Sequence, residues 1–139
     1  MQNTFTRIHK VLTSFIGLAV FVQFFLAGLW HAEVLPDPEA HVFFGLGLLL
    51  ASLMAFLAAL AGRMDRRAIR TTGLLFLLIL LQPILIEQRR SGIPLLSAFH
   101  TLNAAFIGVV AGMLARMPAS LAEKKDMVQG AITPATAGD

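Results

Sequence analysis

Four stretches of the chain are apolar over nearly their whole length, and short polar segments separate them. A hydrocarbon core about 30 Å thick is crossed by about 20 residues of helix. Stretches of that length lie at 8–30, 38–62, 71–87 and 93–115. The third is the shortest, so we expect it to stand nearly upright in the membrane. The pattern predicts an all-α membrane protein whose transmembrane domain covers residues 1–116.

Composition supports a bilayer rather than water as the solvent. Of the 139 residues 57% are hydrophobic and 14% are charged, with a mean hydropathy of +0.76. A soluble domain carries roughly 25% charged residues. The chain has no cysteine, which excludes disulfides and thiolate metal sites and leaves histidine as the strongest metal ligand.

The positions of the basic residues predict the orientation. Lysine and arginine are enriched in the cytoplasmic flanks of membrane spans. With the N-terminus inside, the outer loops hold only Arg89 and Arg90. The inner flanks hold Arg7, Lys10, Arg63, Arg66, Arg67, Arg70, Arg116, Lys124 and Lys125. We therefore expect an antiparallel up-down four-helix bundle in the inner membrane of a bacterium, with both termini cytoplasmic and no nucleic-acid partner.

Local signals mark the ends of the spans. The first apolar run is longer than the core of a secretory signal and lacks a cleavage motif, so we expect it to remain as a helix. Asp37 and Pro38 are typical of a helix start and mark that of the second span, and Pro94 marks the start of the fourth. Residues 117–139 lack a periodic apolar face and predict a flexible cytoplasmic tail. The sequence shows no convincing internal repeat, although the second and fourth spans each carry a histidine near the outer end.

Those two histidines, His41 and His100, are the candidate metal ligands. Small residues follow each of them at helical spacing, Gly45 after His41 and Ala104 and Gly108 after His100. The second and fourth helices of an up-down bundle occupy diagonal corners, so two imidazoles from them can reach one metal between them. We expect this pair, over its small-residue stripes, to hold one heme b near the outer face.

The same residues allow a purely structural interpretation. Gly108 and Gly112 have the spacing that lets membrane helices pack closely. His100 could bond to Asn103 or to a backbone carbonyl such as that of Ile79, which Pro83 deprives of its helical partner. Two further polar residues inside spans, Gln23 and Gln82, are expected to join helices.

Other polar residues have lesser parts in this hypothesis. Arg89 and Arg90 lie at the correct edge of the membrane to bind heme propionates, since arginine binds carboxylates bidentately. Glu39 could orient His41, although residues two apart on a helix are poorly placed for contact. We expect neither His9 nor His31 to ligate heme, and therefore a single heme.

Several motifs resemble a known family. The runs His41 to Gly47, Phe99 to Ala104, Gln23 to Gly28 and Leu81-Gln82-Pro83 together resemble a family of small four-helix bacterial membrane proteins of unknown function. A looser likeness is to one half of heme A synthase, whose second and fourth helices present heme-ligand histidines. That likeness implies His41 and His100 as ligands. The chain has Glu39-x-His41 where that half has Glu-x-x-His, so the likeness implies heme ligation without heme oxidation.

Three functions follow from these features. The first is a b-type cytochrome that exchanges electrons with quinone or a redox protein. An accessory subunit without a cofactor, in a homo-oligomer or a larger membrane complex, is the alternative. Copper or zinc binding by His31 and His41 is the third. No hydrolase or transferase pattern is present, so enzyme activity stays open and a redox carrier is the expectation.

Overall fold

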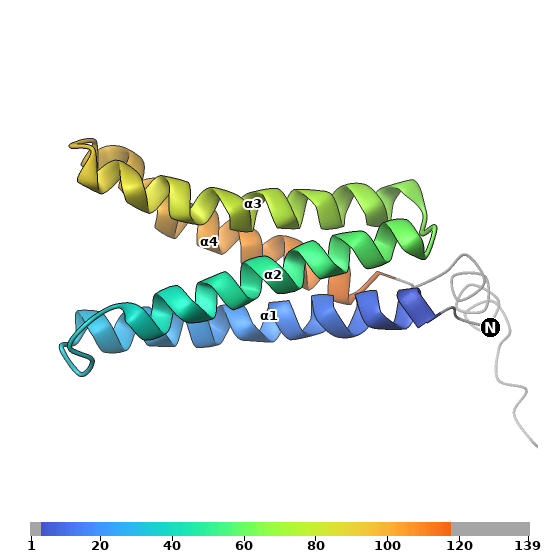
Figure 1. The fold of residues 1–139 in the computed structure, drawn as a ribbon, viewed down its shortest axis with the longest axis horizontal. Coiled ribbons are helices and arrows are strands. Elements are labelled where there is room, and N and C mark those ends of the chain that lie inside the picture. Colours follow the sequence, from blue (N-terminus) through green and yellow to red (C-terminus); the bar gives the residue numbers. More distant parts are fainter. Residues whose placement is uncertain (1–3, 118–139) are drawn as a thin grey trace, which may run out of the picture.

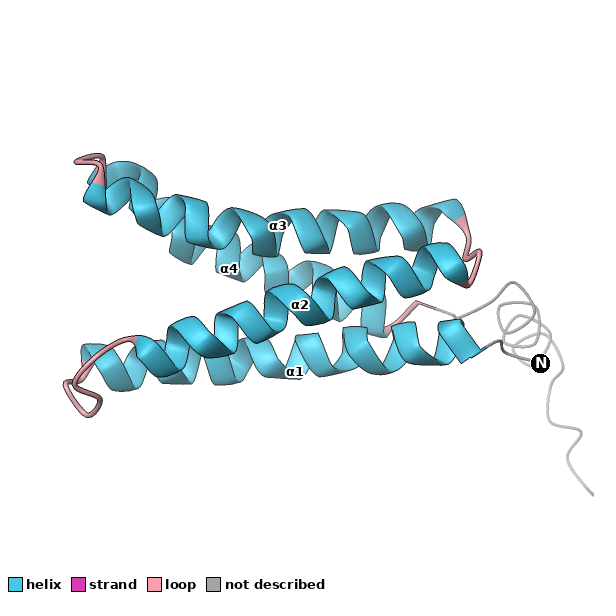
Figure 2. Cartoon of the chain, viewed as in Figure 1, coloured by secondary structure: helices cyan, strands magenta, loops and turns pink. Residues whose placement is uncertain are grey.

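The computed structural model describes residues 4–117, without the side chains of Arg89, Arg90, Pro94 and Ser97. It consists of four α-helices joined by short loops (Figures 1 and 2). The helices are α1 (Thr4–His31), α2 (Glu39–Ala61), α3 (Arg66–Arg90) and α4 (Pro94–Ala115). The predicted tail lies outside the described residues, apart from residue 117.

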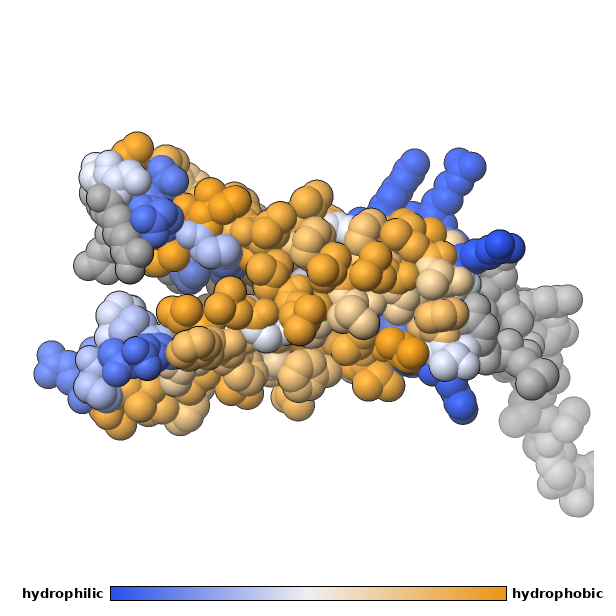
Figure 3. Space-filling model, viewed as in Figure 1, coloured by the Kyte–Doolittle hydropathy of each residue, from blue (hydrophilic) through white to orange (hydrophobic). Residues whose placement is uncertain are grey.

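All four helices are long and apolar enough to cross a membrane. The prediction of four helices of membrane-spanning length and composition is therefore confirmed for residues 4–117, and it suggests a multi-pass membrane protein. Large apolar side chains such as Phe21, Phe43 and Val109 lie exposed on the helices. Figure 3 shows apolar residues over the middle of the visible face and polar residues toward both ends. In water such a surface would be an aggregation hazard, whereas lipid tails solvate it.

α3 differs most from its prediction. The apolar run 71–87 predicts the shortest helix, but α3 has 25 residues and α4, with 22, is shorter. The additional first turn contains arginines, and it is helical because Asp65 caps it: the Asp65 carboxylate accepts hydrogen bonds from the backbone N–H groups of Arg67 and Ala68, both at 2.9 Å. Hydropathy marks the part of a helix that faces lipid, while the cap marks where the helix begins.

The helix backbones form a closed square in which each helix lies next to two others. The contacting pairs are α1 with α2, α2 with α3, α3 with α4, and α1 with α4. The loops 32–38 and 91–93 lie at one end of the bundle, and the loop 62–65 lies at the other end with the start of α1 (Figure 1). We call the first the histidine end and the second the arginine end. α2 and α4 therefore occupy opposite corners.

The two helical hairpins, α1–α2 and α3–α4, are structural repeats of each other. His41 and His100 are 59 residues apart, as are Gln23 and Gln82. α1 and α3 also end 59 residues apart, at His31 and Arg90. Buried residues recur at this spacing: Thr13 and Thr72, Ile16 and Leu75, Val20 and Ile79, Leu48 and Ile107, Ser52 and Ala111, and Ala55 and Leu114. The bundle thus has an approximate twofold relation, which corrects the expectation that the chain has no internal repeat.

The core fills only part of the bundle. Its buried residues run from Thr6 to Val20 in α1 and from Leu48 to Ala59 in α2. In the second hairpin they run from Ala68 to Ile79 and from Asn103 to Leu114. No described residue of the helices beyond these ranges, toward the histidine end, is buried. The hairpins separate there, and Figure 3 shows a notch between them.

Candidate functional site

The structure brings the two predicted ligand histidines together at this partly open end. His41 lies in the first turn of α2 and His100 in the second turn of α4. Their ring centroids are 6.2 Å apart, and the ring planes are tilted by 56°. Both side chains are half-buried. Two histidines from helices at opposite corners of the bundle thus face each other where the hairpins separate.

Backbone carbonyls hold both imidazoles in the same way. Nδ1 of His41 lies 3.2 Å from the carbonyl oxygen of Gln23, and Nδ1 of His100 lies 3.2 Å from that of Gln82. A carbonyl oxygen only accepts, so each Nδ1 is the protonated nitrogen and donates. In a neutral ring Nε2 then carries the lone pair. A backbone carbonyl on one ring nitrogen, with the other available, is the arrangement typical of metal-ligating histidines.

The separation of the rings suits one metal between them. With metal–nitrogen bonds of about 2.0 Å, two imidazoles on opposite sides of one metal have ring centres roughly 6 Å apart. Among the described residues no group of three or more His, Cys, Asp or Glu side chains could hold a metal ion. A bare zinc ion usually takes four ligands. The donor set therefore fits a metal whose other ligands come from a cofactor better than it fits a free ion.

The small residues near the histidines have different surroundings. A Cβ at Gly45 would lie 2.7 Å from Nε2 of Gln23, so the amide of Gln23 occupies that space. A Cβ at Gly108 would meet Val20 of α1 at 3.7 Å, an ordinary packing distance. Ala104 is half-buried. Gly45 and Gly108 thus serve close approach to α1, and neither by itself defines a slot for a ligand.

The two hairpins differ in the polar groups behind the histidines. In the first, Nε2 of Gln23 donates to the carbonyl of His41 at 2.9 Å, and Oε1 of Gln23 is buried without a hydrogen-bond partner. Asn103 replaces the equivalent Phe44 in the second hairpin, and its Nδ2 donates to Oε1 of Gln82 at 3.2 Å and to the carbonyl of Leu78 at 2.7 Å. The equivalent acceptor is thus satisfied in one repeat and unsatisfied in the other.

The remaining predicted residues lie at the edges of the site. Arg89 and Arg90 form the last turn of α3 at the histidine end, with side chains outside the described part. Glu39 is exposed at the start of α2. His31 ends α1 with its ring 4.9 Å from that of Trp30.

His9 lies toward the arginine end, away from the pair. It is 4% exposed, and its Nε2 lies 2.8 Å from Oγ1 of Thr72. The Thr72 hydroxyl donates its one proton to the carbonyl of Ala68 at 2.8 Å, so Nε2 of His9 is the donor to Thr72. His9 therefore uses the nitrogen that His41 and His100 leave available. The position equivalent to His9 in the second hairpin is Ala68, so no histidine faces it from there.

Sequence inspection found both histidines and named a backbone carbonyl as one possible partner of His100, but that carbonyl belongs to Gln82 and not to Ile79, and the partner of His41 was missed. The two partners are 18 residues apart in both hairpins, since each histidine follows a glutamine by that distance. The recurrence of Gln-x17-His was the signal available for both the repeat and the pairing.

No protein-family model, curated protein or solved structure matches the chain. The likenesses to the four-helix family and to half of heme A synthase therefore rest only on short motifs around His41, His100, Gln23 and Gln82.

Proposed function

We propose that this chain is a b-type cytochrome-like membrane protein that binds one heme b between His41 and His100. The observation that carries the proposal is the pair itself: two imidazoles from opposite corners, 6.2 Å apart, each with Nδ1 committed to a backbone carbonyl. A heme held there would supply a one-electron redox couple. The chain's own part is to hold both Nε2 atoms unprotonated and to exclude other ligands.

The shape of the bundle supports the same proposal. A porphyrin ligated by both histidines has to lie between the two hairpins, and the hairpins separate at this end. The helices have no buried core in that part of the bundle, so a large apolar cofactor would supply the missing packing. Arg89 and Arg90, near the mouth of this separation by backbone position, are proposed to pair with the propionates.

The proposed membrane arrangement follows from charge. We place the helices up-down across a bacterial inner membrane, with the arginine end and both termini in the cytoplasm and the histidine end outside. The nine basic residues of the predicted inner flanks then obey the positive-inside rule. A heme near the outer face would exchange electrons with quinone or with a redox protein.

An absorption spectrum tests heme binding directly. Protein expressed with sufficient heme and purified in mild detergent should show a Soret band and, after reduction, a sharp α band. His41→Ala and His100→Ala should each abolish the six-coordinate spectrum, while His31→Ala, a matched control at the end of α1, should keep it. A colourless wild-type protein, or a spectrum unchanged in both ligand variants, would overturn the proposal.

A non-catalytic accessory subunit remains the second candidate. The observation that favours it is that the glutamines, Asn103 and both Nδ1 atoms already bond to neighbouring helices, as structural polar residues in membranes do. This function predicts that the histidine variants change only folding or assembly. A cofactor that copurifies in a histidine-dependent manner would exclude it.

A further inference from the structure

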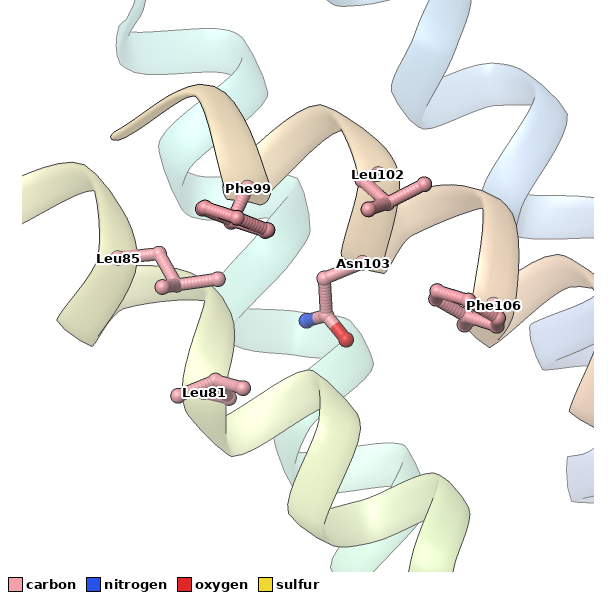
Figure 4. A pocket seen from close by; sticks show the side chains of 6 residues that line it. All are labelled: Leu81, Leu85, Phe99, Leu102, Asn103 and Phe106. Carbon is pink, nitrogen blue, oxygen red and sulfur yellow. The ribbon is translucent and has the colours of Figure 1, made fainter. Parts of the chain in front are cut away.

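A groove on the lipid-facing side of the second hairpin lies beside His100. It has a volume of about 250 Å³ and is lined by Leu81, Leu85, Phe99, Leu102, Asn103 and Phe106 (Figure 4). A cavity of about 150 Å³ accommodates benzene, so this groove has room for a substituted six-membered ring. Its walls are apolar except for Asn103, which comes one turn after His100 on α4.

Asn103 gives the groove a defined polarity. Its side chain is 94% buried, being 6% exposed, and its Nδ2 uses both hydrogens on the carbonyl of Leu78 and on Oε1 of Gln82. Because the Leu78 carbonyl can only accept, the atom that faces it must be the nitrogen. Oδ1 makes no hydrogen bond to any described residue, so the groove offers an acceptor and no donor. It therefore selects a ligand that brings its own N–H or O–H.

The groove is also connected to the proposed ligand histidine. Gln82 accepts from Asn103 through its side chain and from His100 through its backbone carbonyl. Asn103 thus lies two hydrogen bonds from the ring of His100, through the side chain and the backbone of Gln82. The first hairpin lacks this arrangement, because Phe44 occupies the position of Asn103.

We propose that this groove binds the headgroup of a lipid-soluble hydroquinone, whose phenolic O–H donates to Oδ1 of Asn103. The open acceptor favours the reduced form over the quinone, since quinone carbonyls only accept. Phe99 and Phe106 flank the amide along α4 and give an aromatic ring two faces to pack on. The choice of a hydroquinone among hydroxyl-bearing lipids rests on the proposed heme site, whereas the acceptor character of the groove does not.

Calorimetric titration with decylhydroquinone tests the proposal. The full-length protein is placed in nanodiscs, ascorbate keeps the ligand reduced, and empty nanodiscs give the background. We expect saturable binding that weakens at least tenfold for the dimethyl ether of the same compound, which has no O–H to donate. The comparison is made on heme-loaded protein and on His41→Ala, so loss of heme and loss of the groove can be told apart.

The repeat supplies matched variants. Asn103→Phe copies the residue of the first hairpin and should weaken binding at least tenfold, and Asn103→Leu repeats the test should the phenylalanine disturb folding. Phe44→Asn, the reciprocal control, should leave the affinity unchanged. Equal affinity for the hydroquinone and its dimethyl ether would overturn the proposal and show a groove that takes up any apolar molecule. Absence of saturable binding, or full affinity in both Asn103 variants, would also overturn it.

Discussion

Single atoms determine what each polar residue of this bundle does. The same side chain, histidine, adopts opposite tautomers in two places: Nδ1–H donors in His41 and His100, and an Nε2–H donor in His9. The partner selects the tautomer, a backbone carbonyl in the first case and the Thr72 hydroxyl in the second. The first choice leaves Nε2 unprotonated, as a metal ligand requires, whereas the second leaves Nδ1 unprotonated.

Gly45 is a residue at which one methyl group should matter. Gly45→Ala would place a Cβ 2.7 Å from Nε2 of Gln23 and break the hydrogen bond that this Nε2 donates to the carbonyl of His41. Overpacking of this kind costs about 1–3 kcal/mol. Unfolding in mixed micelles with increasing SDS measures the loss. Gly47→Ala, which meets nothing within 4 Å, is the control and should leave stability nearly unchanged.

The His9–Thr72 hydrogen bond joins two helices at opposite corners. Thr72→Val keeps the shape but removes the acceptor, which leaves a buried N–H unsatisfied. We expect a loss of about 1–3 kcal/mol in the free energy of unfolding. Thr71→Val, at a half-buried neighbour, should cost less. The heme spectrum should be the same in both variants, and a bleached spectrum in Thr72→Val would contradict the separation of this contact from the histidine pair.

At the scale of helices, hydropathy predicted the number and approximate positions of the spans, because lipid exposure demands apolar residues. The start of α4 at Pro94 also came from the sequence, since proline suits a first turn, whereas α2 begins at Glu39, one residue after the predicted Pro38. The start of α3 did not, because three arginines conceal its first turn from a hydropathy scan. The pairing of each histidine with a carbonyl on the preceding helix depends on helix rotation, which no local pattern fixes.

The cap at Asp65 should stabilise the first turn of α3. Asp65→Ala removes two hydrogen bonds to backbone N–H groups and should cost about 0.5–2 kcal/mol. Asp65→Asn keeps an acceptor oxygen and should retain most of the stability. Hydrogen exchange of the Arg67 and Ala68 amides locates the effect: both should exchange faster in the alanine variant. Unchanged protection there would show that the arginine-rich turn holds without its cap.

The orientation of the whole molecule is open to a direct test, because the chain has no native cysteine. Val34→Cys places a thiol in the loop at the histidine end, and Met64→Cys places one at the arginine end. In intact cells a membrane-impermeant maleimide should label the first and spare the second until the membrane is permeabilised. The reverse pattern would invert the proposed topology and put the histidine pair near the cytoplasm.

The buried core lies toward the arginine end of the bundle, so the two hairpins are joined firmly at one end only. Buried alanines and the His9–Thr72 hydrogen bond hold the two hairpins together at the arginine end. At the histidine end, which bears His41 and His100, the hairpins are separated. A bundle built this way could fold before the proposed heme binds, and it could admit that heme from the side, between the hairpins, without unfolding. This arrangement would permit the proposed heme to bind after the apoprotein has folded in the membrane.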